Sequence, residues 1–261
     1  MQIPAPRPTV LTRKDDELGQ RFAEDYVGQL FDGIHESMLG HSRSQQKLIG
    51  PSEIGVPCDR ALLYKLAQHP EPPRAPGWKP QIGTYAHAGM ETVFGTPDRT
   101  RAGWLCEERL LVGRIGRDDI HGSCDLFHAG GLVNDWKFVG SKKLKKVKAD
   151  RHPGDQYRAQ AHLYGKGWED DGYPVHVVMI TFLPRDGELG DGYVWWETYN
   201  RQVAEDALDR ANTRLRLLQT MGLEQAVALF PFCDDFWCQW CKADNSVASA
   251  TGMFSKKTTS S

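Results

Sequence analysis

Hydrophobic and polar positions alternate along this chain with two different periods. Between residues 15 and 38 the hydrophobic positions recur at helical spacing, which predicts an amphipathic helix. From residue 104 to residue 138 they form three short runs, 104–113, 120–127 and 132–138, separated by glycine-containing turns. Runs of this length and composition predict β-strands, and their close succession predicts an antiparallel meander.

Helices and further strands are predicted on both sides of this β-rich centre. Five prolines between residues 69 and 80 predict a loop, and the lysine-rich segment after residue 139 is also expected to be a loop. The order of elements therefore predicts a mixed α/β fold, with a mainly helical N-terminal part and a cysteine-bearing C-terminal part. The remaining predicted elements are helices over 59–66, 83–94, 153–166 and 201–221 and strands over 175–183 and 193–197.

The composition is that of a soluble globular protein, because 40% of the 261 residues are hydrophobic and 25% are charged. No hydrophobic run is long enough to span a membrane, and the N-terminus has no apolar signal core, so we expect a cytoplasmic protein. The formal net charge is -2, so any nucleic-acid surface must be a local patch. We expect an N-terminal extension over 1–45, a main domain over 46–245 and a disordered tail over 246–261.

A candidate catalytic site lies in the second and third predicted strands. Asp125 is in the first of these two strands, whereas Asp135 and Lys137 are in the other, two positions apart, so that both point to one face. Mg²⁺ and Mn²⁺ prefer oxygen ligands such as these carboxylates. Lys137 could orient or deprotonate an attacking water, or neutralise charge in the transition state. The alternative is a solvated ion pair on an exposed strand.

These residues resemble a known nuclease pattern. Gly122, Asp125, Asp135 and Lys137 stand at the positions of the G-x-x-D and D-x-K motifs of the PD-(D/E)XK nuclease superfamily. The resemblance implies a restriction-endonuclease-like core, in which a central mixed sheet is flanked by helices. It also implies phosphodiester hydrolysis that depends on Mg²⁺ or Mn²⁺. Asp125 and Asp135 would bind the ion, with the Trp136 carbonyl as a further ligand.

Two more features resemble the RecB-type exonuclease branch of this superfamily. That branch has a metal-binding histidine on a helix before the strands, at the position of His87, four residues after Gly83. It also has a Q-x-x-x-Y motif on the helix after the D-x-K strand, at the positions of Gln160 and Tyr164, which share one helical face. The resemblance implies that this pair helps to position DNA and the catalytic lysine. Taken singly, the histidine would be a packed or exposed helix residue, and the pair a surface glutamine and a core tyrosine.

Four of the six cysteines suggest a metal centre. In a cytosolic chain of this size, metal binding is a better expectation than disulfides. Cys58 precedes the β-rich centre, and Cys233, Cys238 and Cys241 follow it within nine residues. Four thiolates suit either tetrahedral Zn²⁺ or a [4Fe–4S] cluster, and four buried free thiols are the remaining alternative. The other two cysteines, Cys106 and Cys124, are interpreted as core residues.

The cysteine arrangement resembles a sub-branch of the RecB-type nucleases that includes the AddB nuclease domain and the small CRISPR-associated adaptation nucleases. In that sub-branch one cysteine ahead of the core and three behind it hold a [4Fe–4S] cluster, which implies the same cluster here. The spacing of the last three, C-x4-C-x2-C, departs from the wider spacing common in those relatives, so Zn²⁺ remains the alternative. Either centre would attach the C-terminal segment to the N-terminal helices. The whole resemblance covers roughly residues 50–245.

A cluster of positive charges directly follows the D-x-K strand. Phosphates must pass beside the proposed site, so we expect contact with the DNA backbone, although a charge run is also typical of a solvated surface. No segment reads as a sequence-specific recognition helix, so binding to single-stranded DNA or duplex ends should be sequence-independent. Trp136, Trp195 and Trp196 are candidates for base stacking or for core packing. The basic residues are Lys142, Lys143, Lys145, Lys146, Lys148 and Arg151.

The function expected from these features is that of a metal-dependent DNA exonuclease in bacterial or phage recombination, repair or replication. The sequence has no helicase motif of the G-x-x-x-x-G-K-[ST] type, so we expect either a stand-alone nuclease or one that is recruited to a helicase or recombinase partner. One alternative is a non-catalytic DNA-binding or assembly factor on the same scaffold. Another is a zinc-stabilised protein with no nucleic-acid role.

Overall fold

The computed structural model describes residues 27–36, 38, 49–72, 77–235 and 238–250. The chain divides into two compact units, one formed by Met1–Lys47 with Pro73–Ile82 and the other by Leu48–Pro72 with Gly83–Ser261. In the first unit, residues 27–36 are helical, as the periodicity predicted, and residues 15–26 of that predicted helix lie outside the described residues. The sheet belongs to the second unit. The domain boundaries expected near residues 45 and 245 stay a prediction.

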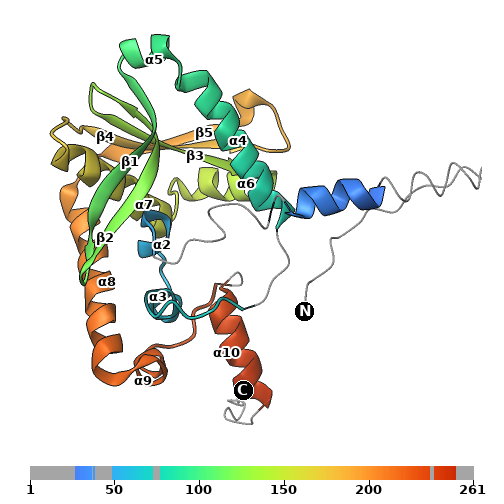
Figure 1. Ribbon diagram of the computed structural model, residues 1–261, viewed down its shortest axis with the longest axis vertical. Helices are drawn as coiled ribbons and strands as arrows, with labels where there is room; N and C mark the ends of the chain where they lie inside the picture. The colour runs from blue at the N-terminus through green and yellow to red at the C-terminus, as the bar shows by residue number, and fades with distance from the viewer. Residues whose placement is uncertain (1–26, 37, 39–48, 73–76, 236–237, 251–261) are drawn as a thin grey trace, which may run out of the picture. The chain divides into compact units, whose positions relative to one another are not determined.

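A five-stranded mixed sheet forms the centre of the second unit (Figure 1). Its strands stand in chain order, and β1, β2 and β3 form the predicted antiparallel meander. β4 runs parallel to β3 and antiparallel to β5. A parallel pair needs a crossover connection, which helices supply here, so the predicted mixed α/β architecture is confirmed. The strands are β1 (Trp104–Ile115), β2 (Asp118–His128), β3 (Leu132–Val139), β4 (Val177–Pro184) and β5 (Tyr193–Thr198).

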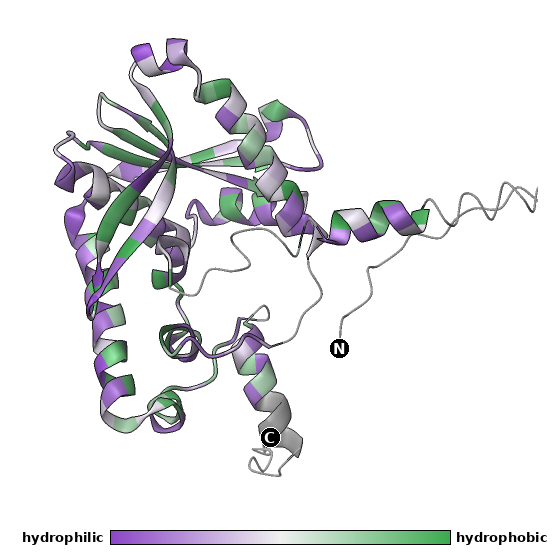
Figure 2. Ribbon diagram, viewed as in Figure 1, coloured by the Kyte–Doolittle hydropathy of each residue, from purple (hydrophilic) through white to green (hydrophobic). Residues whose placement is uncertain are grey.

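Two long helices cover the sheet. α7 (Asp155–Asp170) packs against β1, β3 and β4, and α8 (Arg201–Met221) packs against α7. Asn200 caps the N-terminus of α8, because its side chain accepts a hydrogen bond of 3.0 Å from the N–H of Gln202. Hydrophilic residues are frequent along this helix (Figure 2). None of the described helices is both long and apolar enough to cross a membrane. The other helices are α2 (Pro51–Ile54), α3 (Asp59–Leu66), α4 (Trp78–Phe94), α5 (Pro97–Arg101), α6 (Ser141–Asp150), α9 (Leu223–Ala228) and α10 (Gln239–Ala250), with a 3₁₀ turn, η2, at Leu189–Asp191.

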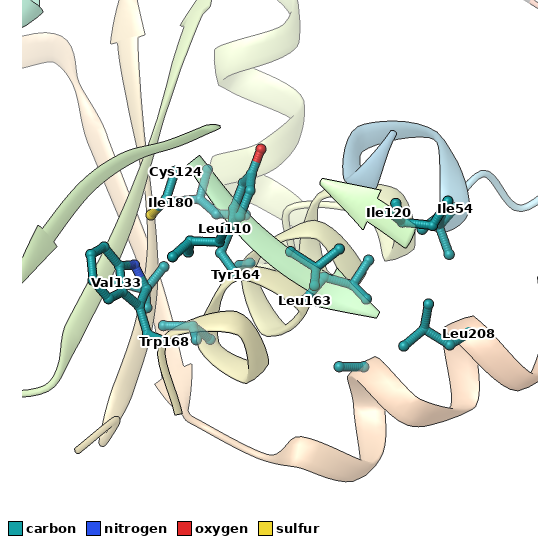
Figure 3. Packing of buried hydrophobic residues seen from close by; sticks show 14 of the residues in the cluster. Ile54, Leu110, Ile120, Cys124, Val133, Leu163, Tyr164, Trp168, Ile180 and Leu208 are labelled. Atoms are coloured by element: carbon teal, nitrogen blue, oxygen red, sulfur yellow. The ribbon is translucent and has the colours of Figure 1, made fainter. Parts of the chain in front are cut away.

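The main hydrophobic core lies where α7 packs on the sheet (Figure 3). Leu163 and Trp168 of α7 belong to the same buried cluster as Val133 of β3 and Ile180 of β4. The Trp168 ring stacks on that of Phe127, with ring centroids 4.1 Å apart. Each large apolar side chain buried in this way contributes about 1.5–3 kcal/mol. This packing of apolar side chains therefore holds β2 and β3 firmly against α7.

The segment after β3 is a helix, α6, so the prediction of a loop was wrong. α6 buries Leu144 and Val147, which are three positions apart and share one face. Two apolar contacts suffice to dock the helix, although exposed lysines dominate its sequence. α4 also begins earlier than predicted, at Trp78, inside the segment expected to be a loop. The other predicted helices and strands within the described residues are present, with ends shifted by a few residues.

Candidate metal centres

Four of the side chains predicted to form a catalytic site come together at β2 and β3. Asp125 belongs to β2, Asp135 and Lys137 belong to β3, and His87 reaches them from α4. Nδ1 of His87 lies 3.5 Å from Oδ2 of Asp125, and the Lys137 ammonium forms an ion pair with Oδ2 of Asp135. The same Oδ2 of Asp125 accepts a hydrogen bond of 2.7 Å from the backbone N–H of Trp136. This bond ties β2 to β3 at the site.

The two aspartates are almost fully buried, with 3% of Asp125 and 1% of Asp135 exposed. Burial raises the pKa of Asp135 to about 6, against the opposing effect of Lys137. Burial also acts to raise the pKa of Asp125, but His87 and Lys137 bring it below its usual value. Burial acts to lower the pKa of Lys137, yet the two aspartates raise it overall, which favours the ammonium form. The two carboxylates therefore ionise over different pH ranges.

The donor atoms of this site fit a divalent cation. Both oxygens of Asp135 and Nδ1 of His87 are buried and have no hydrogen-bond partner among the described residues, although Lys137 forms an ion pair with Asp135. Buried carboxylates are costly unless charge or hydrogen bonds compensate them, and a cation would do so. Carboxylate oxygens suit Mg²⁺ and Mn²⁺, and Mn²⁺ also accepts an imidazole nitrogen. The part expected of the Trp136 carbonyl stays a prediction.

The predicted Gln160 and Tyr164 pair lies on α7, and both residues are buried. Burial and the charge of nearby Asp135 raise the pKa of Tyr164 above its usual value, and the buried Oε1 of Gln160 has no hydrogen-bond partner among the residues that the structure describes. Gly122 packs closely here, because a Cβ at this position would come within 3.2 Å of Tyr164 and 2.5 Å of Pro51. The motif glycine is therefore explained by the close approach of β2 to α7 and α2. The role of the pair in orienting DNA stays a prediction.

One acidic residue at the site was not predicted. Glu107 of β1 places Oε1 4.0 Å from Nδ1 of His87, and donor atoms of His87, Glu107 and Asp125 all lie within 4.8 Å of one another. In the sequence Glu107 is one of two adjacent glutamates in a strand, and nothing in the pattern separates it from Glu108. Its proximity to His87 depends on where α4 lies relative to β1, which hydrophobic periodicity does not report.

The predicted basic patch is formed by the exposed lysines of α6 and by Arg151, which caps its C-terminus, and it lies next to the site. The ammonium of Lys143 is 5.6 Å from the centre of the Tyr157 ring, and that of Lys137 is 4.9 Å from the centre of the same ring. The first turn of α6 is therefore close to Lys137. Contact of this patch with DNA stays a prediction. Its exposed residues are Lys142, Lys143, Lys145, Lys146, Lys148 and Arg151.

The three tryptophans considered for base stacking differ in exposure. Trp136 is buried, and its ring lies 5.6 Å from that of Phe94. Trp195 is buried in the main core. Trp196 on β5 is 62% exposed, so it is the one of the three whose ring is accessible to a base.

The four predicted cysteines form one cluster between α3 and the C-terminal segment. Sγ of Cys58 lies 3.6 Å from Sγ of Cys241 and 3.9 Å from Sγ of Cys238, and with Cys233 all four sulfur atoms lie within 4.8 Å of one another. The distances are longer than the roughly 2.05 Å of a disulfide bond, and the thiols are free. Burial raises the pKa of Cys58 above its usual value and that of Cys238 to about 11. A cation would be needed to hold these groups as thiolates at neutral pH.

The sulfur spacing bears on which metal group fits this cluster. A single tetrahedral ion with bonds of about 2.3 Å holds its four sulfur atoms about 3.8 Å apart. The observed separations of 3.6 and 3.9 Å are close to that value. In a [4Fe–4S] cluster each cysteine binds a different iron, so the sulfur atoms lie farther apart, and these cysteines would have to separate to hold it. These two separations match a single ion, and the zinc and the iron–sulfur assignments both stay predictions.

The cysteine cluster is part of a larger contact between α3 and α10. The Tyr64 ring stacks on the Trp240 ring, with centroids 4.5 Å apart and an interplanar angle of 8°. Asp244 forms an ion pair of 2.5 Å with Arg60 and accepts a hydrogen bond of 2.9 Å from the Tyr64 hydroxyl. Cys58 itself is the N-cap of α3, and its sulfur accepts a hydrogen bond from the helix backbone. A metal at the cysteines would therefore reinforce an existing contact.

The other two cysteines lie outside this cluster. Cys124 is fully buried in the main core, as predicted. Cys106 is only half buried, so its predicted core position was wrong. The reason is that β1 is an edge strand of the sheet, which leaves more of its surface accessible than a central strand would.

Comparison with known proteins gives structural likeness only. No protein-family model matches the chain, and no curated protein matches it. The crystal structure of SSO0001 is 18% identical, with a TM-score of 0.46, over 73% of this chain and 84% of that chain. An alkaline exonuclease, LHK-Exo from Laribacter hongkongensis, is 8% identical, with a TM-score of 0.47, over 82% of this chain and 99% of that chain. LHK-Exo in complex with dAMP is 10% identical, with a TM-score of 0.46, over 71% of this chain and 92% of that chain.

Proposed function

We propose that this chain is a metal-dependent DNA nuclease of the exonuclease type. The observation that carries the proposal is the meeting of two buried aspartates, a lysine and a histidine at adjacent strands, beside an exposed basic helix. The carboxylates and the imidazole are suitable ligands for Mg²⁺ or Mn²⁺. The helix supplies positive charge for a phosphate backbone. Metal-dependent cleavage of DNA uses a site for the ion and a surface that holds the phosphate backbone beside it.

The side chains of the site have separate parts in this reaction. His87, Asp125 and Asp135 would hold the ion, which when bound polarises the scissile phosphate and lowers the pKa of a bound water. Lys137 carries its ammonium beside Asp135, where it can donate hydrogen bonds to the attacking water or to a phosphate oxygen and stabilise negative charge. The Trp136 N–H holds Asp125 in orientation through its 2.7 Å hydrogen bond.

α7 supports this arrangement from the other side. The Tyr157 ring lies against the Lys137 ammonium and so limits the positions that the lysine can adopt. Gln160 is buried, and its amide oxygen has no partner in the described part of the chain, while Tyr164, whose pKa is raised, stays a neutral hydroxyl at neutral pH. We propose that these two side chains orient the DNA strand and the lysine.

The test is cleavage of end-labelled single-stranded DNA in the presence of Mn²⁺. Asp135→Asn and Lys137→Ala are each expected to reduce the rate of nucleotide release by at least about 100-fold, because one removes a ligand and the other the charge beside it. The matched control is Asp119→Asn, which removes an exposed carboxylate paired with Arg114 and should leave the rate unchanged. EDTA should abolish cleavage by the wild type.

Undiminished cleavage by both site variants would rule out this site as the catalytic one. A wild type that binds DNA but shows no Mn²⁺-dependent cleavage would instead support the non-catalytic DNA-binding or assembly factor. Cleavage of circular single-stranded DNA would show an endonuclease rather than an exonuclease. Thermal melting of each variant separates loss of activity from loss of the fold.

The cysteine cluster is proposed to be a structural metal centre. Its ligands come from the N-cap of α3 and from the C-terminal segment, so a bound metal would join the two. The sulfur spacing supports a single Zn²⁺ in place of the [4Fe–4S] cluster that the family resemblance implies. A structural role needs no redox chemistry.

The proposed setting is DNA recombination, repair or replication in a bacterial cytoplasm or during phage infection. Exposed lysines on α6 suit the phosphate backbone rather than base edges, which supports sequence-independent binding of single-stranded DNA or duplex ends. A helicase or recombinase would supply such ends.

A further inference from the structure

Glu107 has an unusual backbone conformation for a residue inside a β-strand. Its φ angle is +55°, a region that L-amino acids rarely occupy and that glycine usually fills. On either side of it β1 pairs regularly with β2, Cys106 with Leu126 and Glu108 with Cys124, whereas Glu107 falls between these pairs. Conformations of this kind persist where the surroundings impose them, and they cluster at functional sites.

The distortion occurs where β1 lies next to Asp125. Oε1 of Glu107 is 4.0 Å from Nδ1 of His87, and the same nitrogen is 3.5 Å from Oδ2 of Asp125. Both distances exceed the roughly 2.7–3.2 Å of a normal hydrogen bond. The buried Nδ1 of His87 indeed has no hydrogen-bond partner within the described part of the chain. Three donor groups therefore approach one another without bonding directly through this nitrogen.

These separations are close to those between ligands of one ion. An octahedral ion with metal–ligand distances of about 2.1 Å places neighbouring ligand atoms about 3.0 Å apart and opposite ones about 4.2 Å apart. The observed 3.5 and 4.0 Å are each within about 0.5 Å of one of these two values, so modest side-chain movements would bring the three donors to one ion. Asp135 does not belong to this set of mutually close donors, and its carboxylate is paired with Lys137.

We propose that Glu107 is a ligand of the divalent cation, together with His87 and Asp125. The proposal rests on the nuclease function proposed above and adds Glu107 to the ligands His87, Asp125 and Asp135 named there. The left-handed backbone at Glu107 serves to bring a carboxylate from β1 to the imidazole of α4. A cation between them offsets the repulsion between the carboxylates of Glu107 and Asp125 and satisfies the buried nitrogen of His87.

The test compares Glu107→Gln with Glu108→Gln in the full chain. Mn²⁺ binding to the metal-free proteins is measured by isothermal titration calorimetry. Glu107→Gln is expected to weaken binding by about 10–100-fold, because an anionic ligand is lost. Glu108 is exposed and pairs across the strands with Cys124, so Glu108→Gln should change the affinity less than twofold. Both variants remove one negative charge at adjacent positions, so a long-range effect of charge would appear in both.

A second variant provides a measurement that does not depend on metal. Glycine adopts a φ of +55° without strain, so Glu107→Gly should raise the melting temperature of the EDTA-treated protein by about 2–4 °C. The same variant should weaken Mn²⁺ binding as Glu107→Gln does. A residue retained for the stability of the strand would show the reverse, with a lower melting temperature and unchanged Mn²⁺ binding, and that result would overturn the proposal.

The outcomes separate this inference from the proposed function. Equal Mn²⁺ affinity of Glu107→Gln and the wild type, with binding lost in Asp125→Asn, would overturn the ligand role and leave the nuclease intact. Weakened binding in Glu107→Gln of a protein that cuts no DNA would support the ligand role and overturn the nuclease. A wild type that binds no Mn²⁺ would overturn both.

Discussion

Asp59, Asp125 and Asp135 are chemically identical side chains in different electrostatic environments. Asp135 is buried beside Asp125, and its pKa rises to about 6. Asp59 is partly exposed at the start of α3, and its Oδ1 accepts hydrogen bonds of 2.8–3.0 Å from Arg210 and Arg214 of α8. Burial acts to raise the pKa of Asp59, but these arginines lower it overall. Asp59 therefore stabilises the fold through local positive charge, whereas the pair at β2 and β3 concentrates negative charge that suits a cation.

Asp59 is expected to make folding stability depend on pH in the acid range. Its folded pKa lies below the unfolded value of about 3.9, so the stabilisation is present above that pH and is lost as the pH falls through the folded pKa. Asp59→Asn should lower the free energy of unfolding by about 1–3 kcal/mol at pH 7. The difference from the wild type should shrink as the pH is lowered from 5 toward 3. Urea unfolding of both proteins at a series of pH values measures this difference in the free energy of unfolding.

The matched control for this prediction is an exposed aspartate. Asp119 pairs with Arg114 near the turn between β1 and β2, where both side chains are exposed, so Asp119→Asn should change the free energy of unfolding by no more than about 0.5 kcal/mol. A loss in Asp59→Asn that stays constant between pH 5 and pH 3 would mean that packing, and not ionisation of Asp59, is responsible.

At the scale of elements, α6 shows how one helix can serve both the fold and the site. Leu144 and Val147 are buried and fix the helix on the body, while the lysines between them are exposed. Lys143 and Lys137 lie over the same Tyr157 ring, which places the start of α6 beside the D-x-K strand. A phosphate backbone that follows α6 would therefore lead to the proposed site.

Removal of two charges from α6 should weaken DNA binding in a salt-dependent manner. The double variant Lys142→Ala with Lys145→Ala is expected to bind single-stranded DNA about 10-fold more weakly at low salt. The slope of log affinity against log salt should fall by about 1.4, since each single-strand phosphate contact contributes about 0.7. Fluorescence anisotropy of a labelled oligonucleotide, with metal-free protein at several salt concentrations, measures both quantities.

The control for α6 removes the same charge elsewhere. Arg114 and Arg117 are exposed around the turn between β1 and β2, so Arg114→Ala with Arg117→Ala should leave the salt slope unchanged. An equal loss in the two double variants would show that DNA responds to total charge and that α6 has no special part.

The elements that the sequence predicts well are those whose hydrophobic pattern matches their burial. The three strands of the meander and α8 have several buried side chains at regular spacing, and they lie close to their predicted positions. α6 was missed because only Leu144 and Val147 carry its apolar signal among many lysines. The parallel pairing of β3 with β4 depends on the crossover through α6 and α7, which no local pattern records.

The residues of the site likewise include some that the sequence predicted and one that it missed. His87, Asp125, Asp135 and Lys137 were predicted because a family motif specifies both residue type and order, and the structure brings them together. Glu107 was missed because its position depends on a positive φ angle in a strand, and a glutamate gives no sequence signal for that conformation.

At the scale of the whole second unit, α3 connects distant parts of the chain. Asp59 joins it to α8, and Arg60 joins it to Asp244 of α10. Cys58 joins it to the three cysteines near the C-terminus. Because these contacts lie within one turn of α3, loss of a metal at Cys58 should loosen the whole contact with α10, including the stacking of Tyr64 on Trp240.

Metal analysis should therefore find about one zinc ion per chain, and removing it should destabilise the protein. Cys241→Ser is expected to lose the zinc and to lower the melting temperature by about 10 °C, because the ion joins segments that are otherwise held by a few side chains. Cys106→Ser is the matched control, since Cys106 lies outside the cluster and its replacement should leave the zinc content unchanged.

The measurements are elemental analysis, thermal melting and the visible spectrum of anaerobically purified protein. Iron and acid-labile sulfide with broad absorption near about 400 nm would contradict the zinc assignment and establish the iron–sulfur cluster, in which case the cysteines must separate from their observed spacing of 3.6 and 3.9 Å.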